Sequence, residues 1–141
     1  MNESTFEFFD HTADLGVRVR APSQPALIAP AIHGLYAAIG ELVAAAGEAQ
    51  PIRFSFETSE PSLLLRDLLA EVLHIFECDR QIVTDPDVSE FSETRLTVAA
   101  RLRPIDADRS RFLREVKAVT YHELAIRKTA EGCEATFIVD I

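Results

Sequence analysis

The run Asp10-His11-Thr12-Ala13-Asp14-Leu15-Gly16 places two carboxylates and an imidazole within one short segment. The alternating apolar stretches 6–10 and 15–21 on either side read as strands, so the run is expected to form the turn between them. Such a turn holds side chains at nearly constant geometry, which suits a hard cation or a catalytic acid. The structural alternative is that the aspartates make turn hydrogen bonds and Gly16 supplies a backbone angle that other residues resist.

Two further segments carry chemical groups. The first is Glu115-Val116-Lys117-Ala118-Val119-Thr120-Tyr121-His122, which reads as a strand with Lys117 and Val119 on one side and a turn at His122. A general base at Lys117 would need burial to lower its pKa. The simpler alternatives are a lysine in a surface ion pair and a histidine satisfied at the end of a sheet. The second segment is the strand-like ending Val139-Asp140-Ile141, where the Asp140 side chain and the terminal carboxylate of Ile141 add oxygen donors close together.

Hydrophobic periodicity predicts the elements that position these groups. Two amphipathic helices are expected over residues 24–46 and 61–77, with Pro30 kinking the first or delaying its start. Further strands are expected over residues 52–56, 81–84, 96–102, 124–126 and 135–141. Turns are expected at Asp85-Pro86-Asp87 and, as a longer hairpin loop, at residues 129–132. The pattern predicts a single α+β domain over residues 1–141, with two helices on one face of a largely antiparallel sheet.

Composition limits the partners. The formal net charge of −9 opposes direct binding to phosphate backbones and anionic lipid, so a protein, a cation or a cationic ligand is the expected partner. No apolar run approaches the length of a membrane span, and no signal-peptide pattern opens the sequence. Cys78 and Cys133 are too few for a disulfide scaffold and are expected to be ordinary buried thiols. The expected location is therefore the cytoplasm.

The three chemical segments together resemble the archease family. The histidine-threonine-alanine-aspartate turn, the V-K-A-V-T-Y-H block over residues 116–122 and the final Asp140-Ile141 match the family's signature blocks in order and spacing. The resemblance spans essentially the whole chain. It implies an α+β fold related to the strand-helix-strand-strand module, which agrees with the periodicity.

The resemblance also implies a function. Archeases activate RtcB-type RNA ligases, which act in tRNA splicing and RNA repair, by promoting GTP-dependent guanylylation of the ligase and its multiple turnover; archeases are not themselves enzymes. The family holds a divalent cation, assigned as calcium, and its ligand positions fall here on Asp14, Asp140 and Ile141. These oxygen donors suit calcium, magnesium or manganese better than zinc. Asp10, His11, Lys117 and His122 remain as groups that support the site or face the partner.

This sequence departs from the family pattern in one loop. A histidine often found shortly before the V-K-A-V-T-Y-H block is absent, and Arg109, Arg111 and Arg114 form a local basic cluster that can alter partner contacts. Two other functions stay open. A general chaperone or modulator of proteins would use an exposed apolar surface and would not need Asp14. A stand-alone metal-dependent hydrolase ranks below both, because the sequence shows no nucleophile motif and no phosphate-binding glycine loop.

Overall fold

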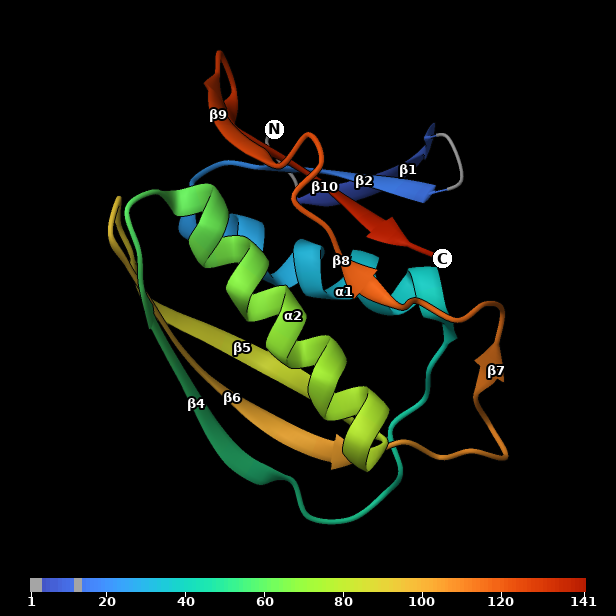
Figure 1. The fold of residues 1–141 in the computed structure, drawn as a ribbon. Coiled ribbons are helices and arrows are strands. Elements are labelled where there is room, and N and C mark those ends of the chain that lie inside the picture. Colours follow the sequence, from blue (N-terminus) through green and yellow to red (C-terminus); the bar gives the residue numbers. More distant parts are fainter. Residues whose placement is uncertain (1–3, 12–13) are drawn as a thin grey trace.

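The computed structural model describes residues 4–11 and 14–141 (Figure 1). Two helices lie between two main sheets, and the strands described pair antiparallel throughout. The predicted α+β class, with two helices on antiparallel sheet, is confirmed. The prediction of one sheet was too simple, because the described strands form a five-stranded, a three-stranded and a two-stranded sheet. The two larger sheets enclose the helices.

The five-stranded sheet has the order β1-β2-β10-β8, with β9 also paired to β10. Its strands are β1 (Thr5–His11), β2 (Asp14–Ala21), β8 (Ala118–Val119), β9 (Ala125–Thr129) and β10 (Gly132–Asp140). Val17 and Phe137 are opposite each other in the register and fully buried toward the helices, whereas Arg18 and Arg20 face away from them. The sheet therefore has an inner face that contributes to the core and an outer face that is turned away from both helices.

The three-stranded sheet forms the opposite layer, below the helices in Figure 1. Its order is β4-β6-β5, and its strands are β4 (Gln50–Glu57), β5 (Gln81–Phe91) and β6 (Arg95–Pro104). The register places Phe54 beside Val98, and both side chains are buried. The core thus lies between the two sheets and is filled mainly from the helices.

The first helix is shorter than predicted. A 3-10 turn, η1 (Pro25–Leu27), precedes α1 (Ile28–Ile39). Pro30 lies in the first turn of α1, where a backbone N–H has no partner within the helix, so the proline delays the start without breaking the helix. Leu42 and Val43 continue the helical spacing, but α1 ends at Ile39 because the chain enters the strand pair of β3 (Gly40–Glu41) with β7 (Arg111–Phe112).

The second helix, α2 (Pro61–Asp79), agrees with the prediction and extends two residues beyond it. Its apolar stripe is buried as expected, with Leu64, Leu65, Leu68, Leu69 and Val72 fully enclosed. On α1, the Tyr36 hydroxyl accepts a hydrogen bond of 2.7 Å from the Val83 N–H, and burial raises the pKa of that hydroxyl. This bond ties α1 to the three-stranded sheet.

Several local predictions were wrong. Asp85-Pro86-Asp87 is an irregularity within β5, where the register shifts between Thr84 and Asp87, and not a turn. Only Ala118–Val119 of the segment 115–122 is strand, and Val116 and Val119 are both buried, so that segment does not alternate as predicted. The hairpin between β9 and β10 pairs Thr129 with Gly132 and is tighter than expected. Cys133 is buried, but Cys78 is exposed.

In the described part of the chain, no helix combines the length and apolar character that crossing a membrane requires.

Candidate functional site

The end of the five-stranded sheet brings two of the predicted ligands together. The register of β2 and β10 places Asp14 directly opposite Asp140, and Asp140 in turn lies opposite Ala118 of β8. Both aspartates alternate with core-facing residues and so belong to the outer face, where each is half-buried. We call this pair, Asp14 and Asp140, the acidic end. In Figure 1 the C-terminal end of β10 lies beside β2.

The other sequence-predicted residues are distributed around the acidic end. Ile141 follows Asp140 directly and is 39% exposed. The backbone N–H of Lys117 donates a 2.8 Å hydrogen bond to the carbonyl oxygen of Asp140, which fixes this end of β10. The exposed Lys117 side chain makes no ion pair with any described residue, so the surface ion pair considered from the sequence does not form there. The His11 backbone pairs with Asp14, while Thr12 and Ala13 lie outside the described residues.

The other two candidates are Asp10 on β1 and His122 after β8. Asp10 is paired with Leu15, so its position belongs to the inner face of the sheet, whereas Asp14 belongs to the outer face. His122 lies beyond β8, and its N–H donates to the Thr120 hydroxyl at 3.2 Å. The N–H and the hydroxyl of Thr120 both donate hydrogen bonds to the carbonyl oxygen of Ile138, which lies two residues before Asp140. Asp10 thus belongs to the other face of the sheet from Asp14, and His122 lies on the segment that follows β8.

The donor chemistry of the acidic end fits a hard cation. Directly opposite residues of an antiparallel pair have Cβ atoms about 4.5–5.5 Å apart, and like charges at such positions are unfavourable without compensation. A divalent cation between two carboxylates supplies that compensation with the oxygen ligands it prefers. Across residues 4–11 and 14–141, no three His, Cys, Asp or Glu side chains are grouped for a metal.

Gly16 has a packing role that the sequence did not reveal. Its backbone is not among the positive-φ positions of the described chain, so the proposed special backbone angle is not its reason. An ideal Cβ on Gly16 would lie 2.2 Å from the Phe9 ring, which covers this position from the neighbouring strand. The Arg18 guanidinium lies 4.7 Å from the centre of the same ring. The glycine therefore lets an aromatic ring lie flat over the outer face beside the acidic end.

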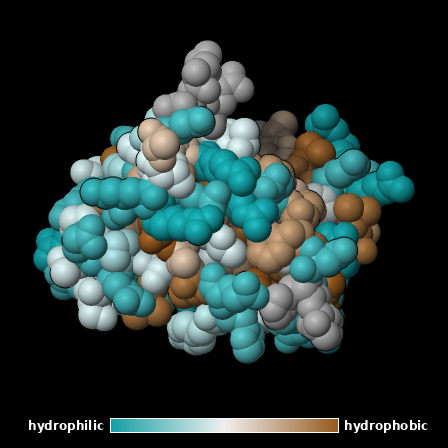
Figure 2. Space-filling model, turned by 90° about the horizontal axis from the view of Figure 1, so that it is seen from above, coloured by the Kyte–Doolittle hydropathy of each residue, from teal (hydrophilic) through white to brown (hydrophobic). Residues whose placement is uncertain are grey.

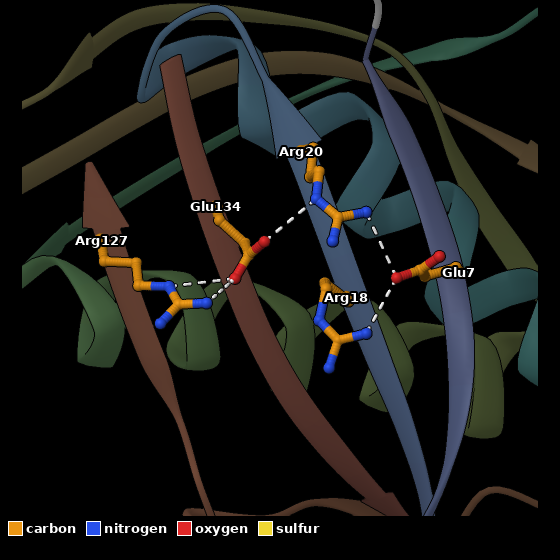
Figure 3. Close-up of polar contacts among 5 residues, drawn as sticks. All are labelled: Glu7, Arg18, Arg20, Arg127 and Glu134. Atoms are coloured by element: carbon orange, nitrogen blue, oxygen red, sulfur yellow. Dashed lines mark hydrogen bonds and ion pairs between the residues drawn. The ribbon is translucent and has the colours of Figure 1, made fainter. Parts of the chain in front are cut away.

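Farther along the outer face, charges are paired with opposite charges (Figure 3). Glu7 accepts hydrogen bonds from Arg18 at 2.8 Å and Arg20 at 3.2 Å. Glu134 accepts from Arg20 at 3.0 Å and from two nitrogens of Arg127 at 3.0 and 2.5 Å. We call these five residues the ion-pair ladder. Figure 2 looks onto this face and shows hydrophilic side chains gathered across it.

The ladder lowers the pKa of each of its two carboxyls, by different routes. The hydrogen bond from Arg18 is the main cause that lowers the pKa of Glu7 below its ordinary value. For Glu134, burial raises the pKa, but the hydrogen bond and charge of Arg127, helped by Arg20, outweigh burial and leave the pKa lowered. Both glutamates therefore favour the ionised form that the arginines require.

The segment that carries the basic cluster Arg109, Arg111 and Arg114 contacts the end of α1. Arg111 belongs to β7, which pairs with β3, and the Arg114 guanidinium donates a 2.6 Å hydrogen bond to the carbonyl oxygen of Ala38. A cation at this position satisfies a carbonyl at the negative end of the helix dipole. The cluster inferred from the sequence is thus partly structural, since Arg114 supports the end of α1.

Comparison with known proteins supports a family assignment. A family model described as the archease protein family (MTH1598/TM1083) matches residues 6–141. The chain is 32% identical to a protein archease of Methanopyrus kandleri over 139 residues, covering 96% of this chain and 99% of that protein. It is 31% identical to a protein archease of Methanosarcina barkeri over 140 residues, covering 96% and 95%.

Solved structures agree with these relatives. A solution structure of protein 1598 of Methanobacterium thermoautotrophicum matches with a TM-score of 0.72 and 26% identity, covering 96% of this chain and 98% of that one. A crystal structure from Thermotoga maritima, described as an archease and possible chaperone, has the same fold with a TM-score of 0.68, 18% identity and 94% coverage of both chains. The match to the family model and the identity to the curated relatives, both over nearly the whole length, show that this chain belongs to the archease family.

Proposed function

We propose that this protein activates an RtcB-type RNA ligase by promoting its GTP-dependent guanylylation and multiple turnover, in tRNA splicing or RNA repair. The protein itself is an activator and not an enzyme. Membership of the archease family supports this proposal, as does the match of three sequence blocks to the family's signature. The negative net charge of −9 agrees with a protein that docks onto a ligase and leaves the RNA to that enzyme.

One observation carries the proposal: the register places Asp14 opposite Asp140 on the outer face of the sheet. Two carboxylates from segments distant in sequence meet at a position where like charges oppose each other. We propose that they hold calcium, with magnesium or manganese as alternatives, and that Ile141 contributes a main-chain or terminal oxygen. The bound cation would neutralise the pair and hold this end of the sheet in a fixed geometry for contact with the ligase.

The remaining candidates have supporting or partner-facing roles in this proposal. Lys117 fixes Asp140 through its backbone N–H and leaves its exposed ammonium for the partner. His122 lies on the exposed turn after β8 and is assigned to partner contact. Asp10, on the opposite face of the hairpin, is also assigned to the partner rather than to the cation. His11 is adjacent to the acidic end through its backbone pairing with Asp14.

A chaperone role is the second candidate function. Phe112 and Leu113 are 49% and 54% exposed, as an apolar client surface would require. The archease from Thermotoga maritima is described as a possible chaperone. Such a role would depend on these apolar side chains and would not depend on Asp14.

The two functions can be separated with one variant. Asp14→Ala should abolish stimulation of guanylylation and multiple turnover of the cognate ligase in the presence of GTP and manganese. The same variant should protect an unrelated aggregating client as well as the original protein does. Asp87→Ala, which removes an exposed carboxylate from the other sheet, is the matched control and should stimulate fully. Full stimulation by Asp14→Ala would reject the proposed role of the acidic end.

The contribution of Ile141 has its own test. A few small residues added after Ile141 would move a terminal carboxylate away from Asp14 and Asp140 while leaving the core unchanged. We expect weaker ion binding in calorimetry and weaker ligase stimulation than for the same residues added before Met1. Equal behaviour of the two extended proteins would remove Ile141 from the site and leave the two aspartates as its protein ligands.

A further inference from the structure

β1 is a free edge strand of the five-stranded sheet. Among the described strands it pairs only with β2, without a break in register from Thr5 to His11. The strand contains three phenylalanines and no proline, lysine or arginine. Phe8 lies opposite the fully buried Val17 and so belongs to the inner face, yet it is 41% exposed. β1 therefore offers a regular, phenylalanine-rich edge on which another strand can pair.

The other long edge strands have features that block such pairing. β4 includes Pro51, whose nitrogen cannot donate a hydrogen bond, and the exposed Arg53. β5 includes Pro86, and its register with β6 shifts twice. Proline, exposed basic side chains and bulges are devices by which proteins keep sheet edges from pairing with other chains. β1 has none of these three devices.

The charge of Glu7 is compensated within the chain. Its side chain lies on the outer face, points toward β2 and accepts hydrogen bonds from Arg18 and Arg20 (Figure 3). The hydrogen bond from Arg18 also lowers the pKa of Glu7, so this carboxylate stays ionised beside its arginines. A second strand that carries the same glutamate therefore meets a neutralised row of side chains on this face.

The free hydrogen-bonding groups of β1 follow from its hairpin with β2. His11 and Asp14 form the closing pair of this hairpin and are separated by two residues in the sequence. A closing pair of this kind exchanges both backbone hydrogen bonds, and such bonded pairs alternate with unbonded pairs along the two strands. The N–H and C=O groups of Phe6, Phe8 and Asp10 therefore point away from β2, toward the free edge.

These three positions are complementary to themselves. In an antiparallel pair of two β1 strands with a two-fold axis at Phe8, Phe8 lies opposite Phe8, and Phe6 lies opposite Asp10 of the other copy. All outward backbone groups are then bonded, the full length of β1 overlaps, and no two carboxylates are directly opposite. An axis at Glu7 would place that glutamate opposite itself, and an axis at Phe9 would shorten the overlap to residues 7–11.

The side of α1 near this edge carries small residues. α1 contacts β1 and β2, whereas α2 contacts β8 and β9 at the other end of the sheet (Figure 1). The side of α1 that faces away from α2 thus lies toward the free edge of β1. The residues of α1 that are not buried are Ala29, His33 and Ala37, at the spacing of a single helix face. α1 therefore places no lysine, arginine or large apolar side chain between two copies that pair through β1.

We propose that two copies of this protein form a symmetric dimer by antiparallel pairing of their β1 strands about Phe8. The second copy fits this edge because one register satisfies every outward backbone group of β1 and brings the exposed Phe8 against its own counterpart. The two five-stranded sheets become one continuous sheet, with both inner faces on the same side. Asp14 and Asp140 lie on β2 and β10 and take no part in the pairing, so the inference does not depend on the proposed function.

Sedimentation equilibrium over a concentration series tests the dimer. The protein should pass from a mass of 15.7 kDa toward twice that value as its concentration rises. Phe8→Lys places two like charges opposite each other on the axis and should weaken the dimer by a factor of about ten or more. Leu113→Lys, which puts the same charge on a 54% exposed residue after β7, is the matched control and should dimerise like the original protein.

A disulfide cross-link tests the register. In a Cys78→Ser background, which removes the exposed native thiol, Phe8→Cys should give a disulfide-linked dimer under mild oxidation. Directly opposite residues of a bonded pair have Cα atoms about 5.5 Å apart, within the range that a disulfide spans. Asp10→Cys in the same background should stay unlinked, because its two copies would lie about 14 Å apart.

The outcomes separate the proposal from its alternatives. A mass of 15.7 kDa at every concentration up to about 1 mM would overturn the dimer and leave the edge to a strand of another protein. Equal association of Phe8→Lys and the original protein, or cross-linking of Asp10→Cys but not of Phe8→Cys, would overturn the pairing through β1. Thermal melts check that each variant is folded, and if Phe8→Lys fails to fold, the cross-links decide alone.

Discussion

The acidic end and the ion-pair ladder occupy the same outer face of one sheet, and both arise from residues placed opposite each other on neighbouring strands. In the ladder, Glu134 lies opposite Arg20 and is bonded to it, with Arg127 on the far side. At the acidic end, the same register places Asp14 opposite Asp140. Cross-strand pairs of opposite charge stabilise a sheet, whereas directly opposed like charges destabilise it.

We therefore expect the ladder to serve stability and the acidic end to serve function, although both lie on β2 and β10. The ladder satisfies its charges within the protein and needs nothing else. The acidic end places two carboxylates opposite each other, and we propose that an external cation binds between them. If this account is right, changes to the ladder should alter stability and spare ligase activation, and changes to the acidic end should do the opposite.

The largest expected effect concerns ion binding at the acidic end. Asp14→Asn and Asp140→Asn should each lower calcium affinity by a factor of about ten or more, because each removes one of only two side-chain carboxylates. Without the ion, Asp140→Asn should be at least as stable as the original protein, since the like-charge pair is gone. Calorimetry with calcium and with manganese, together with urea unfolding in a chelator, would measure both. Retained affinity in both variants would place the cation elsewhere.

The second effect is the stabilisation by the ion itself. A ligand that binds only the native state at a concentration 100 times its Kd adds about 2.7 kcal/mol to the free energy of unfolding. Saturating calcium should therefore raise the Tm of the original protein by several degrees. The same addition should raise the Tm of Asp14→Asn by about half as much or less, because a tenfold weaker Kd leaves roughly 1.4 kcal/mol of stabilisation. Thermal melts over a calcium series would contradict the account if the two proteins shifted equally.

A smaller effect is expected in the ladder. Glu134→Gln should lower the free energy of unfolding at pH 7 by about 1 kcal/mol, a modest value because Arg20 and Arg127 remain in contact with water. Ligase stimulation should be unaffected. The folded-state pKa of Glu134 lies below the ordinary value of 4.5, so its contribution is present above that pH and is lost as the pH falls through the folded-state pKa. The stability gap between the two proteins should therefore close in acid, which urea unfolding at several pH values would show.

The smallest effect belongs to Glu7. Its carboxylate is open to solvent, so Glu7→Gln should destabilise less than Glu134→Gln, even though Glu7 also contacts two arginines. The effect should vanish in high salt because exposed pairs are screened. A larger loss for Glu7 than for Glu134 would mean that burial does not set the strength of the ladder.

Local features of this face could be predicted from the sequence. The alternation of Val17 and Val19 with Arg18 and Arg20 gave the inner and outer sides of β2 correctly. The strands on either side of residues 12–13 were also expected, and they pair as β1 and β2. These features depend on neighbours in sequence, for which the period of two residues is a direct signal.

Contacts between distant segments could not be derived from periodicity. The pairing of Asp14 with Asp140 depends on which strand lies beside β2, and a shift of one residue would have moved Asp140 to the inner face. The early end of α1 has a similar cause: Leu42 and Val43 keep the helical spacing, but the pairing of Gly40 with Phe112 ends the helix.

The central claim is that Asp14 and Asp140 share a cation, and anomalous diffraction from crystals soaked in manganese tests it most directly. The account predicts one strong peak within about 2.0–2.6 Å of carboxylate oxygens of both residues, and its absence from crystals of Asp140→Asn grown alike. No peak at the acidic end at saturating manganese, or a peak that touches neither aspartate, would contradict the account.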